Sequence, residues 1–129
     1  MNYLLDTCAV VFFFENSDKM SEKIKSVISD KNNSIFVSYL TFWELSLKMS
    51  LKKYKGAFNF ELDMLYNFLI DYDFEIINLD LKHFQMLKTL EEIHGDPFDR
   101  LLIATAKSED FIIITSDENI QRYSIKTLW

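Results

Sequence analysis

The sequence has few of the residues that divide a chain into flexible parts: its 129 residues include two glycines and one proline. Linkers between domains are usually rich in these residues, and the sequence has no such stretch, no repeat and no low-complexity tract. Hydrophobic residues make up 49% of the chain, which is enough to bury a core. We therefore expect a single domain over residues 1–129.

Cysteine is nearly absent as well. Cys8 is the only one, which excludes a disulfide within the chain and is typical of cytosolic proteins. The longest apolar run near the start, Ala9–Phe14, is too short for a membrane span or a convincing signal peptide. We expect a cytoplasmic protein without membrane contact, in which Cys8 is a small buried residue rather than a nucleophile.

The chain also lacks an excess of positive charge, since its formal net charge is −6. Such a balance argues against loose, non-specific binding to nucleic acid. The objection weakens if several of the acidic side chains bind metal cations, because bound cations neutralise their charge.

What the sequence does contain is an alternation of apolar strand patterns and amphipathic helix patterns. Strands are expected at Asn2–Asp6, Ser34–Ser38, Phe74–Asn78, Phe111–Thr115 and Ser124–Leu128. Helices are expected at Ala9–Glu15, Asp18–Ser29, from Ser38 or Thr41 to Lys53, Glu61–Asp71, from the Asp80 cap to Leu90, and Phe98–Lys107. The alternation predicts a three-layer α/β domain with a central, mostly parallel five-stranded sheet flanked by helices.

Polar residues mark two of the expected helix starts. Thr41 and Glu44 have the spacing of a capping box, and Ser38 is an alternative cap for the same helix. Asp96 stands directly before Pro97, where an N-cap followed by proline at the first helical position is common. Asp96 is therefore ambiguous between a helix cap and a site residue.

Four acidic residues lie beside apolar strands or within helix patterns, where an uncharged side chain would cost less free energy. They are Asp6, Glu44, Asp99 and Asp117. Asp6 ends the first strand and Asp117 lies just past the fourth, while Glu44 and Asp99 lie on helices next to strands. Ligands of parallel α/β sheets bind beyond the carboxyl ends of the strands, near the point where strand order reverses. If the four carboxylates meet there, they form an oxygen-lined negative pocket that suits Mg²⁺ or Mn²⁺.

The same residues carry a resemblance to a known family. The sequence resembles a PIN-domain ribonuclease, specifically the VapC-like toxin of a type II toxin–antitoxin system. Four segments in the family's order carry the likeness: Tyr3–Thr7, Ser38–Lys48 with its Trp43-Glu44 pair, Asp96–Ala104 and Thr115–Asp117. Members of this branch commonly have a histidine where Cys8 stands and a basic residue where Ser116 stands, so both positions depart from the pattern.

The resemblance implies a metal-dependent endoribonuclease that hydrolyses RNA phosphodiester bonds. It carries over Asp6, Glu44, Asp99 and Asp117 as catalytic residues, and Asp6, Asp99 and Asp117 as ligands of Mg²⁺ or Mn²⁺. Glu44 either binds the metal directly or orients the attacking water. The implied partners are a cognate antitoxin, the RNA substrate and a second copy of the chain in a homodimer.

Supporting roles are open for four neighbouring side chains: Thr7, Ser116, Lys48 and Arg100. Thr7 and Ser116 either orient the adjacent carboxylates or simply end strands. Lys48 either pairs with Glu44 on the helix surface or contacts RNA, and Arg100 either steers phosphate or forms a surface ion pair. His83 and His94 are each isolated, and we expect His94 to lie on the surface of a loop.

Two other functions compete with the ribonuclease. A catalytically decayed PIN fold would act as a binding module, although the four acidic positions are all present. A phosphatase with an aspartyl nucleophile would also place an aspartate after its first strand. That chemistry needs a second aspartate two residues further on, where this chain has Cys8.

Overall fold

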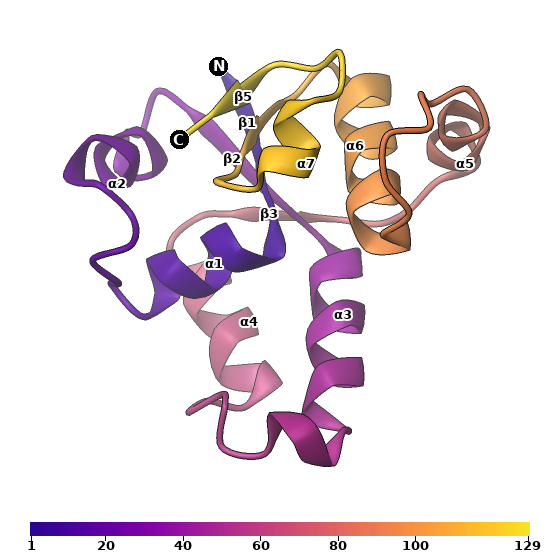
Figure 1. The fold of residues 1–129 in the computed structure, drawn as a ribbon. Coiled ribbons are helices and arrows are strands. Elements are labelled where there is room, and N and C mark those ends of the chain that lie inside the picture. The colour runs from indigo at the N-terminus through magenta and orange to yellow at the C-terminus, as the bar shows by residue number, and fades with distance from the viewer.

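The structure is a computed structural model that describes residues 1–129, and its centre is a five-stranded sheet (Figure 1). The strands are β1 (Asn2–Leu5), β2 (Ser34–Ser38), β3 (Glu75–Ile77), β4 (Ile112–Ile114) and β5 (Thr127–Leu128). Their order is β3-β2-β1-β4-β5, and every neighbouring pair is parallel. The predicted α/β class is confirmed, and the sheet is parallel throughout.

Seven α-helices connect the strands: α1 (Thr7–Phe14), α2 (Glu22–Ser29), α3 (Tyr39–Met49), α4 (Leu62–Asp71), α5 (Leu81–Leu87), α6 (Pro97–Glu109) and α7 (Glu118–Gln121). A short 3₁₀ turn, η1 (Lys52–Tyr54), follows α3. None of these helices has the length and apolar character that crossing a membrane requires.

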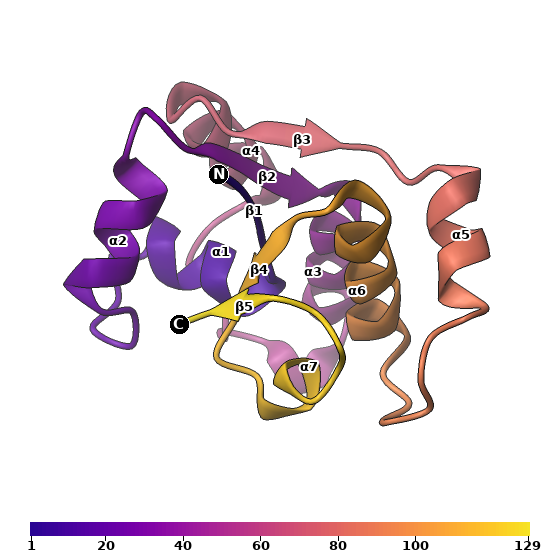
Figure 2. The same ribbon diagram turned by 90° about the horizontal axis from the view of Figure 1, so that it is seen from above.

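The alternation of side chains along the strands produces the three layers. In β1, Tyr3 and Leu5 pack in one buried cluster with residues of α1, α2 and α4, whereas Leu4 packs in a second cluster with residues of α6. Successive side chains of a strand point to opposite faces of the sheet, so one strand contributes to both cores. Figure 2 shows α1 and α2 on one side of the sheet and α5 and α6 on the other.

The second and third predicted helices differ in extent from the observed ones. α2 begins at Glu22 rather than Asp18, because the Ser21 hydroxyl accepts the Ile24 backbone N–H at 3.3 Å and caps the helix there. α3 begins at Tyr39, and Ser38, the alternative cap, is its N-cap. The predicted capping box of Thr41 and Glu44 is therefore wrong. The chain leaves α3 at Met49, short of the expected end at Lys53.

The C-terminal part of the chain also departs from expectation. The predicted strand Ser124–Leu128 shrinks to the two residues of β5, and the short helix α7 precedes it. α7 is only one turn long, so it has too few positions to show a helical period in the sequence. Its consequence for the site is that Asp117 becomes a helix cap rather than a simple loop residue.

The helix after β3 is shorter than predicted, because α5 ends at Leu87 rather than Leu90. His83 is not isolated: its Nδ1 accepts the Asp80 backbone N–H at 3.0 Å, and its Nε2 lies 2.9 Å from Glu109 Oε1. The buried ring therefore joins the start of α5 to the end of α6, which fixes the helix pair on its side of the sheet.

Candidate active site

Asp6 lies at the carboxyl end of β1. Strand order in the sheet reverses at this point, between β1 and β4. Its Oδ1 accepts the Ala9 backbone N–H at 2.7 Å, which makes Asp6 the N-cap of α1. Its Oδ2 accepts a short hydrogen bond from the Thr115 hydroxyl. The residue is only 6% exposed, so both of these bonds are shielded from water.

The environment of Asp6 disfavours its charged form. Burial raises the pKa of this carboxyl from its ordinary 3.8 to about 6, although the hydrogen bonds from Thr115 and Ala9 act in the opposite direction. The charges of Asp99 and Asp117 raise the pKa of Asp6 further. Three of the four predicted site residues therefore share one region of negative potential, as expected from the topology.

Asp99 lies in the first turn of α6 and is half-buried. Its Oδ2 is 3.1 Å from Nε2 of His94. Burial raises the pKa of Asp99, His94 lowers it through the hydrogen bond, and the charges of Asp96 and Asp117 raise it again. Asp96 itself accepts the backbone N–H groups of Phe98 and Asp99 at 2.9 and 3.1 Å, so it caps α6, one of the two roles that the sequence left open for it.

Asp117 is joined to Asp6 through Thr115. The Thr115 hydroxyl donates to Asp6 and accepts the Asp117 backbone N–H at 3.0 Å. Asp117 Oδ1 in turn accepts the N–H groups of Asn119 and Ile120 and caps α7. Ser116 is exposed and takes no part in these contacts.

The hydroxyl that contacts both Asp6 and Asp117 is that of Thr115, a residue that the sequence had not indicated. The sheet register pairs Leu5 with Ile114, so the next residues, Asp6 and Thr115, face each other. The signal that could have found Thr115 is therefore its position directly after β4, opposite the aspartate that follows β1.

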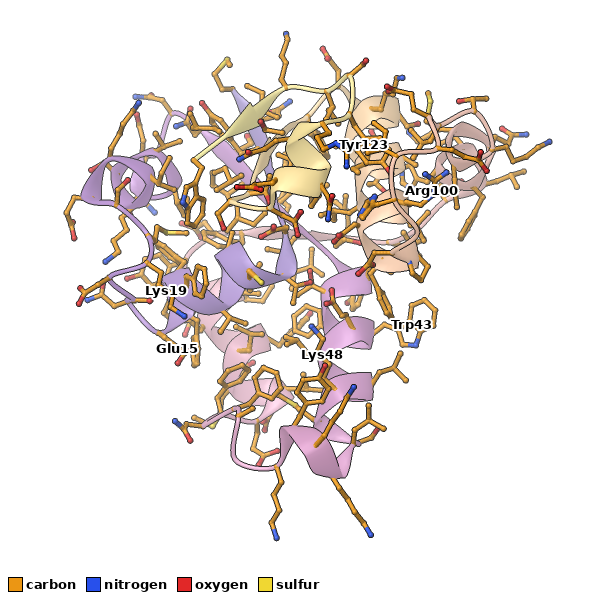
Figure 3. The ribbon with its side chains drawn as sticks, in the orientation of Figure 1. Glu15, Lys19, Trp43, Lys48, Arg100 and Tyr123 are labelled. Carbon is orange, nitrogen blue, oxygen red and sulfur yellow. The ribbon has the colours of Figure 1, made fainter.

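Glu44 is held by donors on both of its oxygens. The Thr7 hydroxyl donates to Oε1 at 2.7 Å, and Lys48 Nζ donates to Oε2 at 2.8 Å, the predicted i,i+4 pair. Burial by itself lowers the pKa of Lys48, but its hydrogen bond and ion pair with Glu44 more than offset this and raise it. Figure 3 shows Lys48 extending from α3 into the space between α3 and α1.

Glu44 and Asp99 both line a narrow crevice. It is lined by residues from the start of α1, from α3 and from the start of α6: Thr7, Leu40, Thr41, Glu44, Phe98, Asp99 and Leu102. The Thr7 hydroxyl also lies 3.3 Å from the buried hydroxyl of Thr41. The fourth carboxylate therefore shares an edge of the sheet with the other three, as predicted from the topology.

Arg100 makes contacts that neither of its two predicted roles describes. Its Nη1 donates to the backbone carbonyls of Glu91 and His94 at 2.8 and 3.4 Å, and to the Tyr123 hydroxyl at 3.0 Å (Figure 3). The expected surface ion pair is absent. The guanidinium instead anchors the loop between α5 and α6 to the C-terminal part of the chain.

Cys8 and His94 differ from their predicted environments. Cys8 is exposed rather than buried, although partial desolvation and the nearby Asp6 charge raise the pKa of its thiol to about 11. The His94 side chain is only 13% exposed, because it lies between Asp99 and Tyr123. The sequence did not indicate the contacts of His94 with Asp99 and Tyr123, because both depend on how the loop before α6 folds back.

The four carboxylates offer the hard oxygen donors that Mg²⁺ and Mn²⁺ prefer. No group of three acidic, histidine or cysteine side chains converges closely enough to hold a metal ion by direct contact alone. Mg²⁺ usually keeps several waters and takes one or two carboxylates, so it fits a site that binds partly through water. Asp99 Oδ1 and Asp117 Oδ2 accept no hydrogen bond from the protein, and each Asp6 oxygen accepts only one, so all three carboxylates keep lone pairs that can bind a cation.

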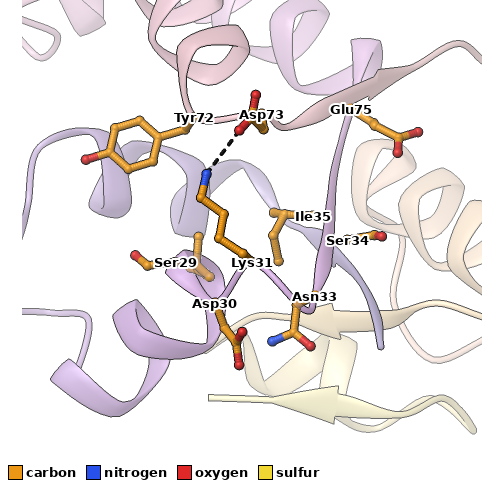
Figure 4. Close-up of a pocket in the computed structure, with 10 residues that line it drawn as sticks. Ser29, Asp30, Lys31, Asn33, Ser34, Ile35, Tyr72, Asp73 and Glu75 are labelled. Atoms are coloured by element: carbon orange, nitrogen blue, oxygen red, sulfur yellow. Dashed lines mark hydrogen bonds and ion pairs between the residues drawn. The ribbon is translucent and has the colours of Figure 1, made fainter.

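A larger hollow, of about 270 Å³, lies at the opposite edge of the sheet (Figure 4). It is lined by the segment before β2 and the segment before β3, and Lys31 and Asp73 form an ion pair across it at 3.0 Å. Both partners are largely exposed, so this pair contributes little to stability. This hollow is larger than the crevice beside the carboxylates, which holds only about 10 Å³, but the carboxylates carry the chemistry of a metal site.

Comparison with known proteins defines the class to which this fold and site belong. Residues 3–126 match the model of the PIN domain family, and the chain therefore belongs to that family. The resemblance seen in the sequence is thus confirmed. None of the curated proteins matches the chain.

Several solved structures share the fold at low sequence identity. VapBC2 from Rickettsia felis, bound to a DNA fragment from its promoter, matches with a TM-score of 0.74 and 19% identity, covering 100% of this chain and 99% of that one. DNA-bound VapBC from Salmonella typhimurium matches with a TM-score of 0.70, 16% identity and coverage of 99% and 97%. VapBC-1 from nontypeable Haemophilus influenzae matches with a TM-score of 0.66, 14% identity and coverage of 99% and 97%.

Proposed function

We propose that this protein is a metal-dependent endoribonuclease that acts as the toxin of a toxin–antitoxin pair. The observation that supports the proposal most is that the charges of Asp99 and Asp117 act on Asp6, which lies at the point of the sheet where strand order reverses. Membership of the PIN domain family supports it, as do fold neighbours whose structures are VapBC complexes. RNA is the proposed substrate and the cytoplasm the proposed place of action.

Asp6, Asp99 and Asp117 would hold Mg²⁺ or Mn²⁺, with Asp6 and Asp99 as the firmest ligands. When bound, the ion supplies positive charge that stabilises the attacked phosphate and makes a water molecule more acidic. Glu44, fixed by Thr7 and Lys48, orients the attacking water from the other side of the crevice. The expected products carry a 5′ phosphate and a 3′ hydroxyl.

The proposed protein partners are an antitoxin and a second copy of the chain. An acidic site in a chain of net charge −6 favours an inhibitor that places a basic side chain, such as arginine, among the carboxylates. Phe12 and Phe42 are half-buried on α1 and α3, and apolar residues of the inhibitor would lie along these helices. For the homodimer, α3 offers exposed apolar side chains at Tyr39, Trp43 and Leu47.

The test is cleavage of total RNA by the purified protein with Mg²⁺, Mn²⁺ or EDTA. Asp99→Asn serves as the inactive variant, and Asp71→Asn, an exposed aspartate at the end of α4, is the matched control. We expect cleavage by wild type and Asp71→Asn in the presence of a divalent ion only. Cleavage that persists in EDTA or in Asp99→Asn would contradict the proposal.

A non-catalytic PIN fold is the second candidate, because no three ligand side chains converge closely enough to hold a metal by direct contact. It predicts no cleavage by wild-type protein under any of these ionic conditions. Binding of a partner would then be unaffected by Asp99→Asn, because the carboxylates would have only a structural role.

A further inference from the structure

A chain of hydrogen bonds leads from the C-terminal part of the protein to Asp99. Arg100 Nη1 lies 3.0 Å from the Tyr123 hydroxyl, which lies 2.7 Å from His94 Nδ1. His94 Nε2 lies 3.1 Å from Asp99 Oδ2. The rings of His94 and Tyr123 also pack edge to face, with centroids 5.4 Å apart. Arg100, Tyr123 and His94 have no role in the proposed function.

The donors in this series of hydrogen bonds determine which atoms carry the hydrogens. Arg100 can only donate, so the Tyr123 oxygen must accept from it. The His94 backbone N–H also points at this oxygen, at 3.4 Å. With its lone pairs taken, Tyr123 can only donate its own hydrogen to His94 Nδ1. The imidazole hydrogen of the neutral ring then lies on Nε2, which donates to Asp99.

We infer that His94 is a positioning residue for the metal site: its Nε2–H holds Asp99 Oδ2 and thereby leaves Oδ1 free to bind a divalent cation. This inference rests on the proposed function. Ligand carboxylates are commonly oriented by such outer hydrogen bonds, and losing one costs about 10–100-fold in metal affinity or activity. The bond is shielded, since the side chains of His94 and Asp99 are 13% and 23% exposed.

A purely structural role for His94 would be to anchor the loop before α6. That anchoring is already provided by Arg100, which donates to the carbonyls of Glu91 and His94, and by Glu91, which accepts the Ser124 backbone N–H at 3.1 Å. These bonds hold the loop without using the imidazole. The contact of the ring with Asp99 is therefore available for orientation of the carboxylate.

The first experiment determines the His94 tautomer by ¹⁵N NMR of the metal-free protein in mildly alkaline buffer. We expect the neutral ring with its hydrogen on Nε2. In Tyr123→Phe, which lacks the donor to Nδ1, we expect a smaller excess of this tautomer, because only the Asp99 carboxylate then favours it. A wild-type neutral ring that carries its hydrogen on Nδ1 would overturn the inference.

The second experiment measures Mn²⁺ affinity by calorimetry, with thermal unfolding of each variant as a check of the fold. His94→Leu should bind Mn²⁺ at least about tenfold more weakly than wild type, and His94→Gln, which keeps an N–H donor, should recover part of that loss. Glu91→Ala is the matched control, because it releases the same loop from Ser124 without touching the imidazole. Equal losses of affinity in His94→Leu and Glu91→Ala would overturn the inference.

Failure of the inference and failure of the proposed function give different results. Wild-type protein that neither binds Mn²⁺ nor cleaves RNA would contradict the proposed function. The tautomer is measured without metal, so it tests the hydrogen bonds of His94 independently of Mn²⁺ binding and RNA cleavage. A wild-type site that binds Mn²⁺ with the affinity of His94→Leu would contradict the positioning role alone.

Discussion

Thr115 donates its hydroxyl hydrogen to the buried carboxylate of Asp6, and this bond joins the ends of β1 and β4. The same oxygen accepts the Asp117 backbone N–H, so one side chain connects two of the candidate metal ligands. The arrangement explains how an acidic residue can be buried at the centre of a parallel sheet. It also makes the stability of the protein depend on pH in a way that can be measured.

Thr115→Val removes the hydroxyl with little change of shape. Because the Thr115 hydrogen bond lowers the pKa of Asp6, its loss should raise that pKa further and destabilise the charged form. We expect a loss of about 1–3 kcal/mol in the free energy of unfolding at about pH 8, and a smaller loss at about pH 5. The measurement is urea unfolding in EDTA at both values.

Thr105→Val is the control for that change. Thr105 is also fully buried, but its hydroxyl donates to the neutral Leu101 carbonyl at 2.8 Å. Its loss of stability should be the same at both pH values. A pH-independent loss in Thr115→Val as well would show that the Asp6 carboxylate does not depend on this bond.

Asp6→Asn should change the pH dependence of stability in the metal-free protein. The pKa of Asp6 is raised from 3.8 to about 6, so the folded state binds the proton more tightly than the unfolded state. The resulting stabilisation is complete below pH 4 and is lost as the pH rises through about 6, a change of roughly 3 kcal/mol. Asparagine keeps the acceptor for Ala9 but has no charge, so this loss should disappear.

Urea unfolding of wild type and Asp6→Asn from about pH 4 to pH 8 measures the difference. We expect the variant to become the more stable protein as the pH rises. If wild type instead gains stability relative to Asp6→Asn over this range, the carboxyl is stabilised in its charged form, and the assigned environment is incorrect.

Asp96 can be tested separately from the carboxylates because its contacts are those of a helix cap. Asp96→Asn keeps a side-chain oxygen for the N–H groups of Phe98 and Asp99, so stability and RNA cleavage should be retained. Asp96→Ala loses that acceptor and should lose about 0.5–2 kcal/mol of stability. A loss of cleavage in the stable Asp96→Asn protein would make Asp96 a member of the catalytic site.

Divalent cations should stabilise the folded protein through Asp99. Mg²⁺ binds a site that exists only in the folded chain, so it adds roughly 1–3 kcal/mol at about 10–100 times its Kd. Asp99→Asn should melt above wild type in EDTA, because it relieves the repulsion from Asp96 and Asp117, and should lose most of the gain from Mg²⁺. Thermal melts at constant ionic strength measure both effects, with Asp71→Asn as the control that should follow wild type.

The elements that the sequence predicted well are those with long patterns of their own. The five strands, the α/β alternation and the acidic positions after β1 and β4 follow from apolar runs and the topology of parallel sheets. The cap role of Asp96 was also predictable, because Pro97 directly follows it. These features depend on residues that are neighbours in the chain.

The features that the sequence missed depend on contacts between distant residues. Thr115 meets Asp6 across 109 positions, and Tyr123 meets His94 across 29. No local pattern marks either pair, and the single turn of α7 is too short to show a period. Cys8 was misplaced for the same reason, since its exposure follows from the packing of α1 and not from its own type.

The most direct test of the account is calorimetric titration with Mn²⁺ of wild type and of single variants at the four carboxylates, Asp6→Asn, Glu44→Gln, Asp99→Asn and Asp117→Asn. If these side chains form one site, wild type binds Mn²⁺, each of the four variants binds it more weakly, and Asp71→Asn binds as wild type does. A wild-type protein without Mn²⁺ affinity, or four variants that bind as Asp71→Asn does, would contradict the account.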